Sequence, residues 1–180
     1  MLVELLAVSP SDSLLDVGTG TGALLREVER SGGRPARAIG VDVSDRMLAR
    51  TRAVVPPGTE LRRADARALP LPDASADVIT CAYLLHLLTG EVRTEVLREL
   101  RRVLVPGGRL GVVTVAPPKH ALAKLVSAPV RAAAARSSGL LAGLRPLDPA
   151  ADLQAAGFQV DAVHRTAIGY PSLCIRAIRR

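Results

Sequence analysis

Short aliphatic runs alternate with segments of helical periodicity along most of the chain. An uninterrupted aliphatic run is typical of a strand buried on both faces, and helices between such runs indicate a parallel sheet covered on two sides. We therefore expect seven strands, at Ser13–Val17, Ala38–Asp42, Glu60–Arg63, Asp77–Ala82, Arg109–Val115, Gln159–Thr166 and Ser172–Arg179.

The expected helices have recognisable ends. Two glycines follow the helix predicted at Gly20–Ser31, and Ser44 is placed to cap the next one. The helix predicted at Glu91–Leu104 has acidic residues at its start and arginines at its end, which suits the helix dipole. Asp148 and Pro149 are expected to begin a short fourth helix.

Only residues 167–171, which contain "IGYP", separate the last two strands. A parallel crossover needs about a dozen residues or more, so these strands must form an antiparallel hairpin. The pattern predicts an α/β fold with a doubly wound, seven-stranded, mostly parallel sheet and an antiparallel hairpin strand at its C-terminal end.

Composition limits the class of protein further. At 180 residues, 48% of them hydrophobic and 23% charged, the chain is expected to form one globular domain over residues 1–180. No apolar run reaches the roughly 20 residues of a membrane-spanning helix, and the first residues do not resemble a signal peptide. The two cysteines lack the close spacing of a metal site, so no metal is expected, and a cytoplasmic location is predicted.

The net charge of +7 is concentrated in residues 116–147, which carry five basic and no acidic side chains. We interpret this basic insertion either as a lid over a hydrophobic substrate, compatible with peripheral membrane contact, or as a solvated helix pair. The rest of the chain is nearly neutral, which does not favour a nucleic-acid partner.

The stretch "LLDVGTGTGALL", residues 14–25, contains a glycine loop between a predicted strand and a predicted helix. Its G-x-G-x-x-G/A spacing, with Asp42 about 20 residues further on, is shared by several nucleotide sites. Asp16 distinguishes between these kinds of nucleotide site, because a carboxylate beside the loop would repel the pyrophosphate of a dinucleotide. It would instead attract the ammonium group of S-adenosylmethionine.

Four further stretches follow in order: "GVDVSDRML", "ADARALPLPDASADVITCAYLLHLL", "LRELRRVLVPGGRLGVVT" and "AAGF". With the glycine loop, they resemble the class I S-adenosylmethionine-dependent methyltransferases, particularly the small-molecule and quinone group. The resemblance covers nearly the whole chain. It implies a Rossmann-like domain with S-adenosylmethionine as cofactor. It also implies methyl transfer, by in-line displacement, to a small hydrophobic acceptor with an O, N, S or C nucleophile.

The resemblance also implies roles for particular residues. Asp16 would orient the cofactor amino group, Asp42 would accept both ribose hydroxyls, and Cys81 would contribute only its backbone carbonyl. For Met47, ordinary core packing explains the residue equally well. The expected cofactor-binding residues are Asp16, Gly18, Thr19, Gly20, Gly22, Asp42, Val43, Met47, Asp65, Ala66, Cys81 and Ala82.

Tyr83 and His86 are the candidates for contact with the methyl acceptor. His86 either acts as a general base or only shapes the pocket, and no catalytic residue is assigned. The chain lacks the Pro-Cys and the Asn/Asp-Pro-Pro-aromatic motifs that base methyltransferases carry at this point. An RNA methyltransferase using the basic insertion and a non-catalytic cofactor-binding protein remain as alternatives. Because only about a dozen residues precede Ser13, we expect the N-terminal cap of this family to be short or missing.

Overall fold

The structure is a computed structural model that describes residues 1–117, 146–166 and 171–180. The lid hypothesis for the basic insertion lies almost wholly outside these residues. The described elements, in chain order, are α1 (Leu2–Leu6), β1 (Ser13–Val17), α2 (Ala23–Arg30), β2 (Arg37–Asp42), α3 (Asp45–Arg52), β3 (Glu60–Arg63), β4 (Ala76–Ala82), η1 (Leu85–Leu87), α4 (Gly90–Val103), β5 (Leu104–Val115), α6 (Ala150–Ala155), β6 (Phe158–Thr166) and β7 (Ser172–Arg179).

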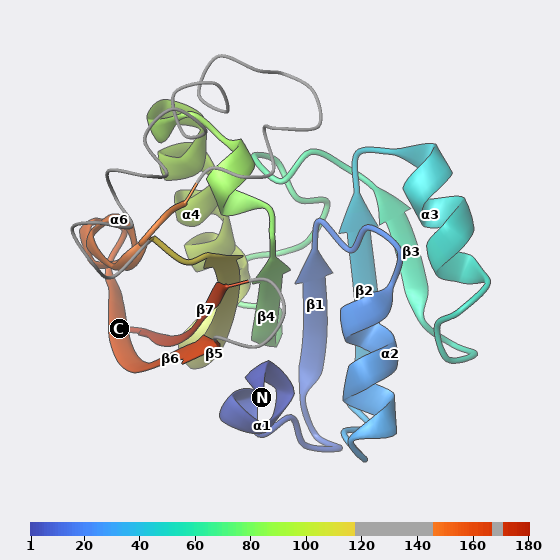
Figure 1. The fold of residues 1–180 in the computed structure, drawn as a ribbon. Coiled ribbons are helices and arrows are strands. Elements are labelled where there is room, and N and C mark those ends of the chain that lie inside the picture. The colour runs from blue at the N-terminus through green and yellow to red at the C-terminus, as the bar shows by residue number, and fades with distance from the viewer. Residues whose placement is uncertain (118–145, 167–170) are drawn as a thin grey trace.

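The strands form one seven-stranded sheet in the order β3-β2-β1-β4-β5-β7-β6. β7 runs antiparallel to both of its neighbours, β5 and β6, and the other strand pairs are parallel. The predicted doubly wound sheet with an antiparallel hairpin is confirmed. In Figure 1, α2 and α3 lie in front of the sheet and α4 lies behind it.

Alternate residues of β1 divide the core between the two faces of the sheet. Leu15 and Val17 belong to the larger cluster, which includes Leu97 and Leu100 of α4. Leu14 points to the other face and belongs to the cluster formed with α1 and α2. This period of two is what a strand buried on both sides requires. The four central strands β2, β1, β4 and β5 are parallel, so their carboxyl ends lie along the same edge of the sheet.

Two predicted boundaries were wrong because glycines adopt conformations that hydrophobic periodicity does not report. α2 begins at Ala23 rather than Gly20, because Gly22 is its N-cap residue with φ +76°. β5 begins at Leu104 rather than Arg109, since Leu104 already pairs with Ala76. The intervening "VPGG" forms an irregularity within the strand, where Gly107 has φ +77°.

Smaller differences affect the other ends. β2, β4 and β6 each begin one residue earlier than predicted, and α4 spans Gly90–Val103. The predicted cap of α3 is present, because the Ser44 hydroxyl accepts a hydrogen bond from the Met47 amide. At α6 the N-cap residue is Pro149, which makes no side-chain cap hydrogen bond, while an Asp148 carboxylate oxygen accepts one from the Ala150 amide. No helix among the described residues is long and apolar enough to cross a bilayer.

Two short elements were not predicted. α1 packs on β5 so closely that a Cβ atom at Gly111 would lie 2.6 Å from Leu6 Cδ1. η1 follows β4 directly and buries Leu85 and His86. Both elements are too short to produce a periodic hydrophobic pattern.

Candidate functional site

The glycine loop between β1 and α2 depends on left-handed backbone at three positions. Gly18, Gly20 and Gly22 have φ values of +71°, +56° and +76°, which L side chains adopt rarely. Gly22 has a second reason to be glycine, because a Cβ atom there would lie 2.9 Å from Thr51 Cγ2. The Thr51 hydroxyl also donates a 2.7 Å hydrogen bond to the Gly20 carbonyl, which fixes the loop against α3.

Asp16, the fourth residue of β1, carries a buried carboxyl group beside this loop. Its side chain is only 2% exposed, and Oδ1 accepts a 2.7 Å hydrogen bond from the Thr80 hydroxyl. Oδ2 is buried and has no hydrogen-bond partner among the described residues. Burial raises the pKa of Asp16, and the nearby hydroxyls of Thr80 and Thr19 oppose this shift only in part. A buried carboxyl oxygen without a donor is a position that a cationic ligand group would satisfy.

Asp42 ends β2 and connects two parts of the site. Oδ2 accepts a 2.9 Å hydrogen bond from the Gly20 amide, and Oδ1 accepts one of the same length from the Ser44 amide. Each carboxylate oxygen can accept two hydrogen bonds, so both oxygens keep one acceptor position. Asp42 can therefore hold the glycine loop and a pair of ligand hydroxyls simultaneously.

A cleft of about 410 Å³ opens at the carboxyl ends of β1 and β2. Five of the predicted cofactor residues line it: Gly18, Asp42, Val43, Asp65 and Ala66. Sequence reasoning missed the other lining residues, which are Val17, Val41, Ala64, Arg67, Leu84, Leu88, Val92 and Val96. The apolar run around His86 was the available signal for Leu84 and Leu88. The cleft thus combines an apolar wall with two carboxylates.

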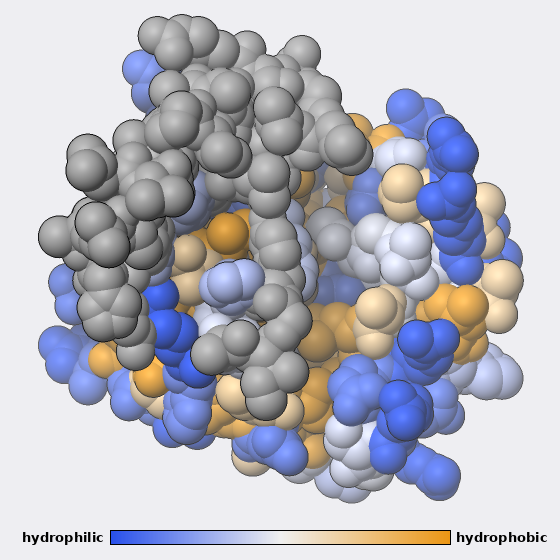
Figure 2. All heavy atoms as spheres, in the orientation of Figure 1, coloured by the Kyte–Doolittle hydropathy of each residue, from blue (hydrophilic) through white to orange (hydrophobic). Residues whose placement is uncertain are grey.

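Asp65 faces the cleft but has a partner that the sequence did not indicate. Arg67 donates to both of its carboxylate oxygens, and this hydrogen bonding holds the pKa of Asp65 below its usual range. Asp65 therefore stays ionised, but Arg67 occupies part of its acceptor capacity. Hydrophilic residues cover the outer side of α3, at the right of Figure 2.

The remaining predicted cofactor residues do not line the cleft. The amides of Gly18 and Thr19 both donate to the Val41 carbonyl, so Thr19 fixes the loop to β2. Met47 lies in the first turn of α3, and Asp16, Gly20, Gly22, Cys81 and Ala82 are likewise outside the lining. Cys81 is fully buried, and burial raises the pKa of its thiol to about 12. It is therefore no nucleophile near neutral pH.

The two predicted acceptor residues lie together just beyond β4. The rings of Tyr83 and His86 meet edge to face, with centroids 6.0 Å apart and planes at 88°. His86 is 5% exposed, and its Nδ1 atom is buried without a hydrogen-bond partner among the described residues. Burial lowers the pKa of His86, so the imidazole is neutral at pH 7 and can accept a proton.

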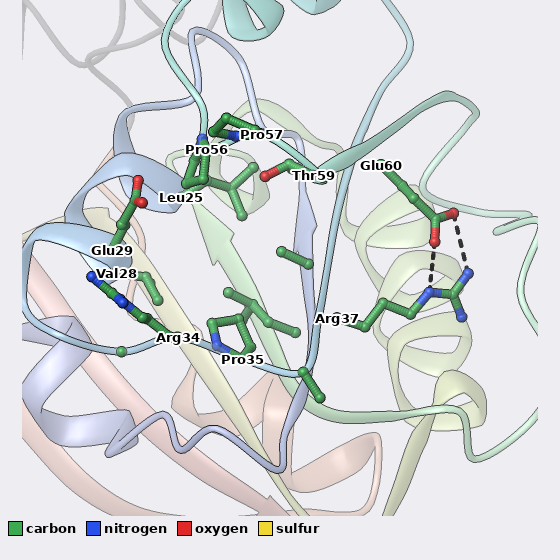
Figure 3. A pocket seen from close by; sticks show the side chains of 15 residues that line it. Leu25, Val28, Glu29, Arg34, Pro35, Arg37, Pro56, Pro57, Thr59 and Glu60 are labelled. Carbon is green, nitrogen blue, oxygen red and sulfur yellow. Dashed lines mark hydrogen bonds and ion pairs between the residues drawn. The ribbon is translucent and has the colours of Figure 1, made fainter.

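A second hollow, of about 690 Å³, lies at the opposite edge of the sheet (Figure 3). It is lined by the first residues of β1 and β2, by α2 and by the loop before β3, and the Arg37–Glu60 ion pair lies at its side (Figure 3). Although larger, it is not the candidate site. Ligands of open α/β sheets bind at the carboxyl ends of the strands, and the glycine loop is there too.

The groups in and beside the smaller cleft fit S-adenosylmethionine, and Asp16 is among those that lie beside it, outside the lining. The partnerless oxygen of Asp16 suits an ammonium group, and the remaining acceptor positions of Asp42 suit two ribose hydroxyls. Apolar residues of the lining suit an adenine ring. In the part of the chain that the structure describes, no cluster of three His, Cys, Asp or Glu side chains could hold a metal ion.

Known proteins resemble this chain in sequence and in fold. Residues 14–108 match the family described as "Methyltransferase domain". The ubiquinone/menaquinone biosynthesis C-methyltransferase UbiE of Ectopseudomonas mendocina (strain ymp) is 36% identical over 125 residues, covering 67% of this chain and 48% of that protein. The chain spans about half the length of the curated relatives it matches.

Two solved structures agree in fold. An S-adenosylmethionine-dependent methyltransferase from Mesorhizobium loti superposes with a TM-score of 0.70 at 21% identity, covering 99% of this chain and 95% of that one. An enzyme described in the same way, from Aquifex aeolicus, gives 0.74 at 19% identity, covering 99% and 88%. The family match, the fold and the donor set agree: the chain belongs to the class I S-adenosylmethionine-dependent methyltransferases.

Proposed function

We propose that this methyltransferase acts on a small hydrophobic acceptor, and that the acceptor is the ring carbon of a reduced quinone. The observation that carries the proposal is the similarity to relatives named quinone C-methyltransferases, which includes 36% identity over 125 residues. The apolar surface beside the cleft supports it, because Leu84 and Leu88 line the cleft and Leu87, 45% exposed, lies beside them.

In the proposed complex, residues at the carboxyl edge hold the cofactor from three sides. Asp16 accepts hydrogen bonds from its ammonium group, Asp42 from its ribose, and Asp65 from the exocyclic amine of its adenine. Val43 and Ala66 contact the adenine ring. When bound, the cofactor supplies an electrophilic methyl group, and the protein needs to contribute alignment and exclusion of water.

The acceptor must be reduced because a hydroquinone ring carbon is electron-rich, whereas a quinone ring carbon is electrophilic. A ring carbon that gains a methyl group loses one proton. His86 is the candidate to accept this proton, because its imidazole lies just beyond β4 and is neutral at pH 7, although burial, which lowers its pKa, makes it a weak base there. We further propose that the reaction takes place in the cytoplasm.

The test is methyl transfer from labelled S-adenosylmethionine to a prenylated 1,4-naphthohydroquinone, kept reduced under anaerobic conditions. The predicted product is the hydroquinone with a new methyl group on the ring carbon next to a hydroxyl. Methylation on oxygen would overturn the assignment of a carbon nucleophile. Absence of any product, from protein shown to bind S-adenosylhomocysteine, would overturn the quinone proposal.

A further inference from the structure

Tyr83 is an exposed aromatic residue with an unfavourable backbone conformation. Its φ is +55°, in the left-handed region that bulky residues rarely adopt. Strain of this kind persists where the surroundings enforce it, and it concentrates at binding sites. The side chain is nevertheless 43% exposed. Burial of the ring therefore does not explain why a tyrosine occupies this position.

Aromatic residues are scarce in this protein, which makes an exposed one more informative. The chain has two tyrosines, one phenylalanine and no tryptophan. Phe158 is buried in the core at 3% exposure. Among residues 1–117, 146–166 and 171–180, Tyr83 is therefore the only one of these residues with a ring at the surface.

The Tyr83 ring is fixed although it is exposed. Its hydroxyl forms a 2.7 Å hydrogen bond with the hydroxyl of Ser172, at the start of β7. Its amide donates a 2.8 Å hydrogen bond to the Val113 carbonyl in β5. The edge-to-face contact with His86 restrains the ring from a third direction. A surface that is ordered before binding loses little conformational entropy when a ligand packs on it.

The residue that follows Tyr83 lies against the glycine loop, while the Tyr83 ring extends toward β7. A Cβ atom at Gly18 would lie 3.2 Å from Leu84 Cδ2, so residue 84 covers the loop. β1 and β4 are also neighbours, with Asp16 opposite Thr80. Tyr83 therefore lies at the carboxyl end of β4, one residue from the Leu84 side chain that lines the cleft and on the side where Asp16 would hold the methionine portion of the cofactor.

We propose that Tyr83 determines acceptor specificity: its ring is the flat surface on which the planar ring of the reduced quinone packs. Ser172 is a positioning residue that holds the tyrosine ring in the required orientation. This inference rests on the proposed function and adds to it the residue that selects a planar acceptor. Packing of two rings adds affinity beyond the area that it buries.

The experiment compares Tyr83→Leu, Tyr83→Gly and Tyr83→Phe with wild type, using the naphthohydroquinone assay and S-adenosylhomocysteine binding. Loss of the ring should raise the KM for the hydroquinone about ten-fold in the Leu and Gly variants. The dissociation constant of S-adenosylhomocysteine should not change. Tyr83→Phe keeps the ring and should retain most of the acceptor affinity. Val163→Ala, which truncates an exposed residue of β6, is the control.

The Tyr83→Gly variant shows whether Tyr83 is needed to bind the acceptor or only to stabilise the fold. Glycine adopts a φ of +55° without strain, which offsets part of the stability lost with the Ser172 hydrogen bond and the His86 contact. Tyr83→Gly should therefore unfold at a temperature no lower than Tyr83→Leu, while its KM rises to the same extent. Wild-type turnover with an unchanged KM in both the Leu and Gly variants would overturn this inference and leave the proposed function intact. Wild-type protein that binds S-adenosylhomocysteine but never methylates the hydroquinone would overturn both.

Discussion

The substitution Asp16→Asn replaces one buried oxygen with an amide nitrogen and should affect stability and binding in opposite directions. In the free protein, Asp16 Oδ2 has no hydrogen-bond partner among the described residues, and burial raises the pKa of the group. A neutral amide removes this burial penalty while its oxygen still accepts the Thr80 hydrogen bond. The unfolding free energy at pH 7 should therefore stay the same or rise.

The pH dependence follows from the direction of the pKa shift. Because the folded-state pKa of Asp16 is raised above the unfolded value of 3.8, the folded protein binds the extra proton more readily. Wild type should match Asp16→Asn most closely below pH 3.8. It should lose stability relative to the variant as the pH rises through the folded-state pKa.

Binding should weaken because the ligand ammonium loses its charged partner. A hydrogen bond to a charged group contributes about 1.5–3 kcal/mol, so the affinity for S-adenosylhomocysteine should fall about 10- to 150-fold. Methylthioadenosine, which has the nucleoside but lacks the amino acid portion, should bind wild type and Asp16→Asn equally well.

Isothermal titration of both ligands into both proteins provides the measurement, with urea unfolding of the free proteins alongside. Equal S-adenosylhomocysteine affinities in wild type and variant would refute the role of Asp16. An equal loss for methylthioadenosine would show that the variant disturbs the whole site rather than one hydrogen bond.

Three further changes test other parts of the site. Gly18→Ala places a side chain at φ +71° and against Leu84, so it should cost about 1–2 kcal/mol of stability and weaken S-adenosylhomocysteine binding in titrations. Gly32→Ala is the control: it has φ +81° but no neighbour within 4 Å, so it should lower stability without affecting binding. Asp42→Ala should abolish detectable stabilisation by S-adenosylhomocysteine in thermal unfolding, whereas Asp45→Ala, whose side chain is 71% exposed, should leave it intact. Burial lowers the folded-state pKa of His86 below its usual 6.5. The contribution of neutral His86 to the unfolding free energy is therefore present above pH 6.5 and is lost as the pH falls through the folded-state pKa. Between pH 7 and pH 5, the urea midpoint should fall more for wild type than for the His86→Leu variant.

Much of the fold follows from local patterns in the sequence. Aliphatic runs located the strands to within about one residue, apart from β5, because a strand buried on both faces must be apolar at nearly every position. The five residues 167–171, between the last two strands, determined the direction of β7, since no crossover fits in them. The start of β5 was missed because Gly107 allows an irregular pairing, which has no periodic signature.

The sequence predicted a site residue only where that residue type, at that position, has one clear physical explanation. The glycines of the loop and the two aspartates at strand ends are of this kind. The Arg67 side chain over Asp65 was not predictable, because an exposed arginine can take many conformations. The strain at Tyr83 was also missed, because only glycine and asparagine commonly mark positive φ in a sequence.

Thermal unfolding with S-adenosylmethionine, S-adenosylhomocysteine, NAD and NADP in parallel tests the central claim most directly. A ligand present at 100 times its dissociation constant should add about 2.7 kcal/mol of stability. The account predicts stabilisation by the first two ligands, and loss of that stabilisation in Asp42→Ala. Stabilisation by NAD or NADP alone would contradict the assignment of Asp16 and Asp42, and the methyltransferase account with it.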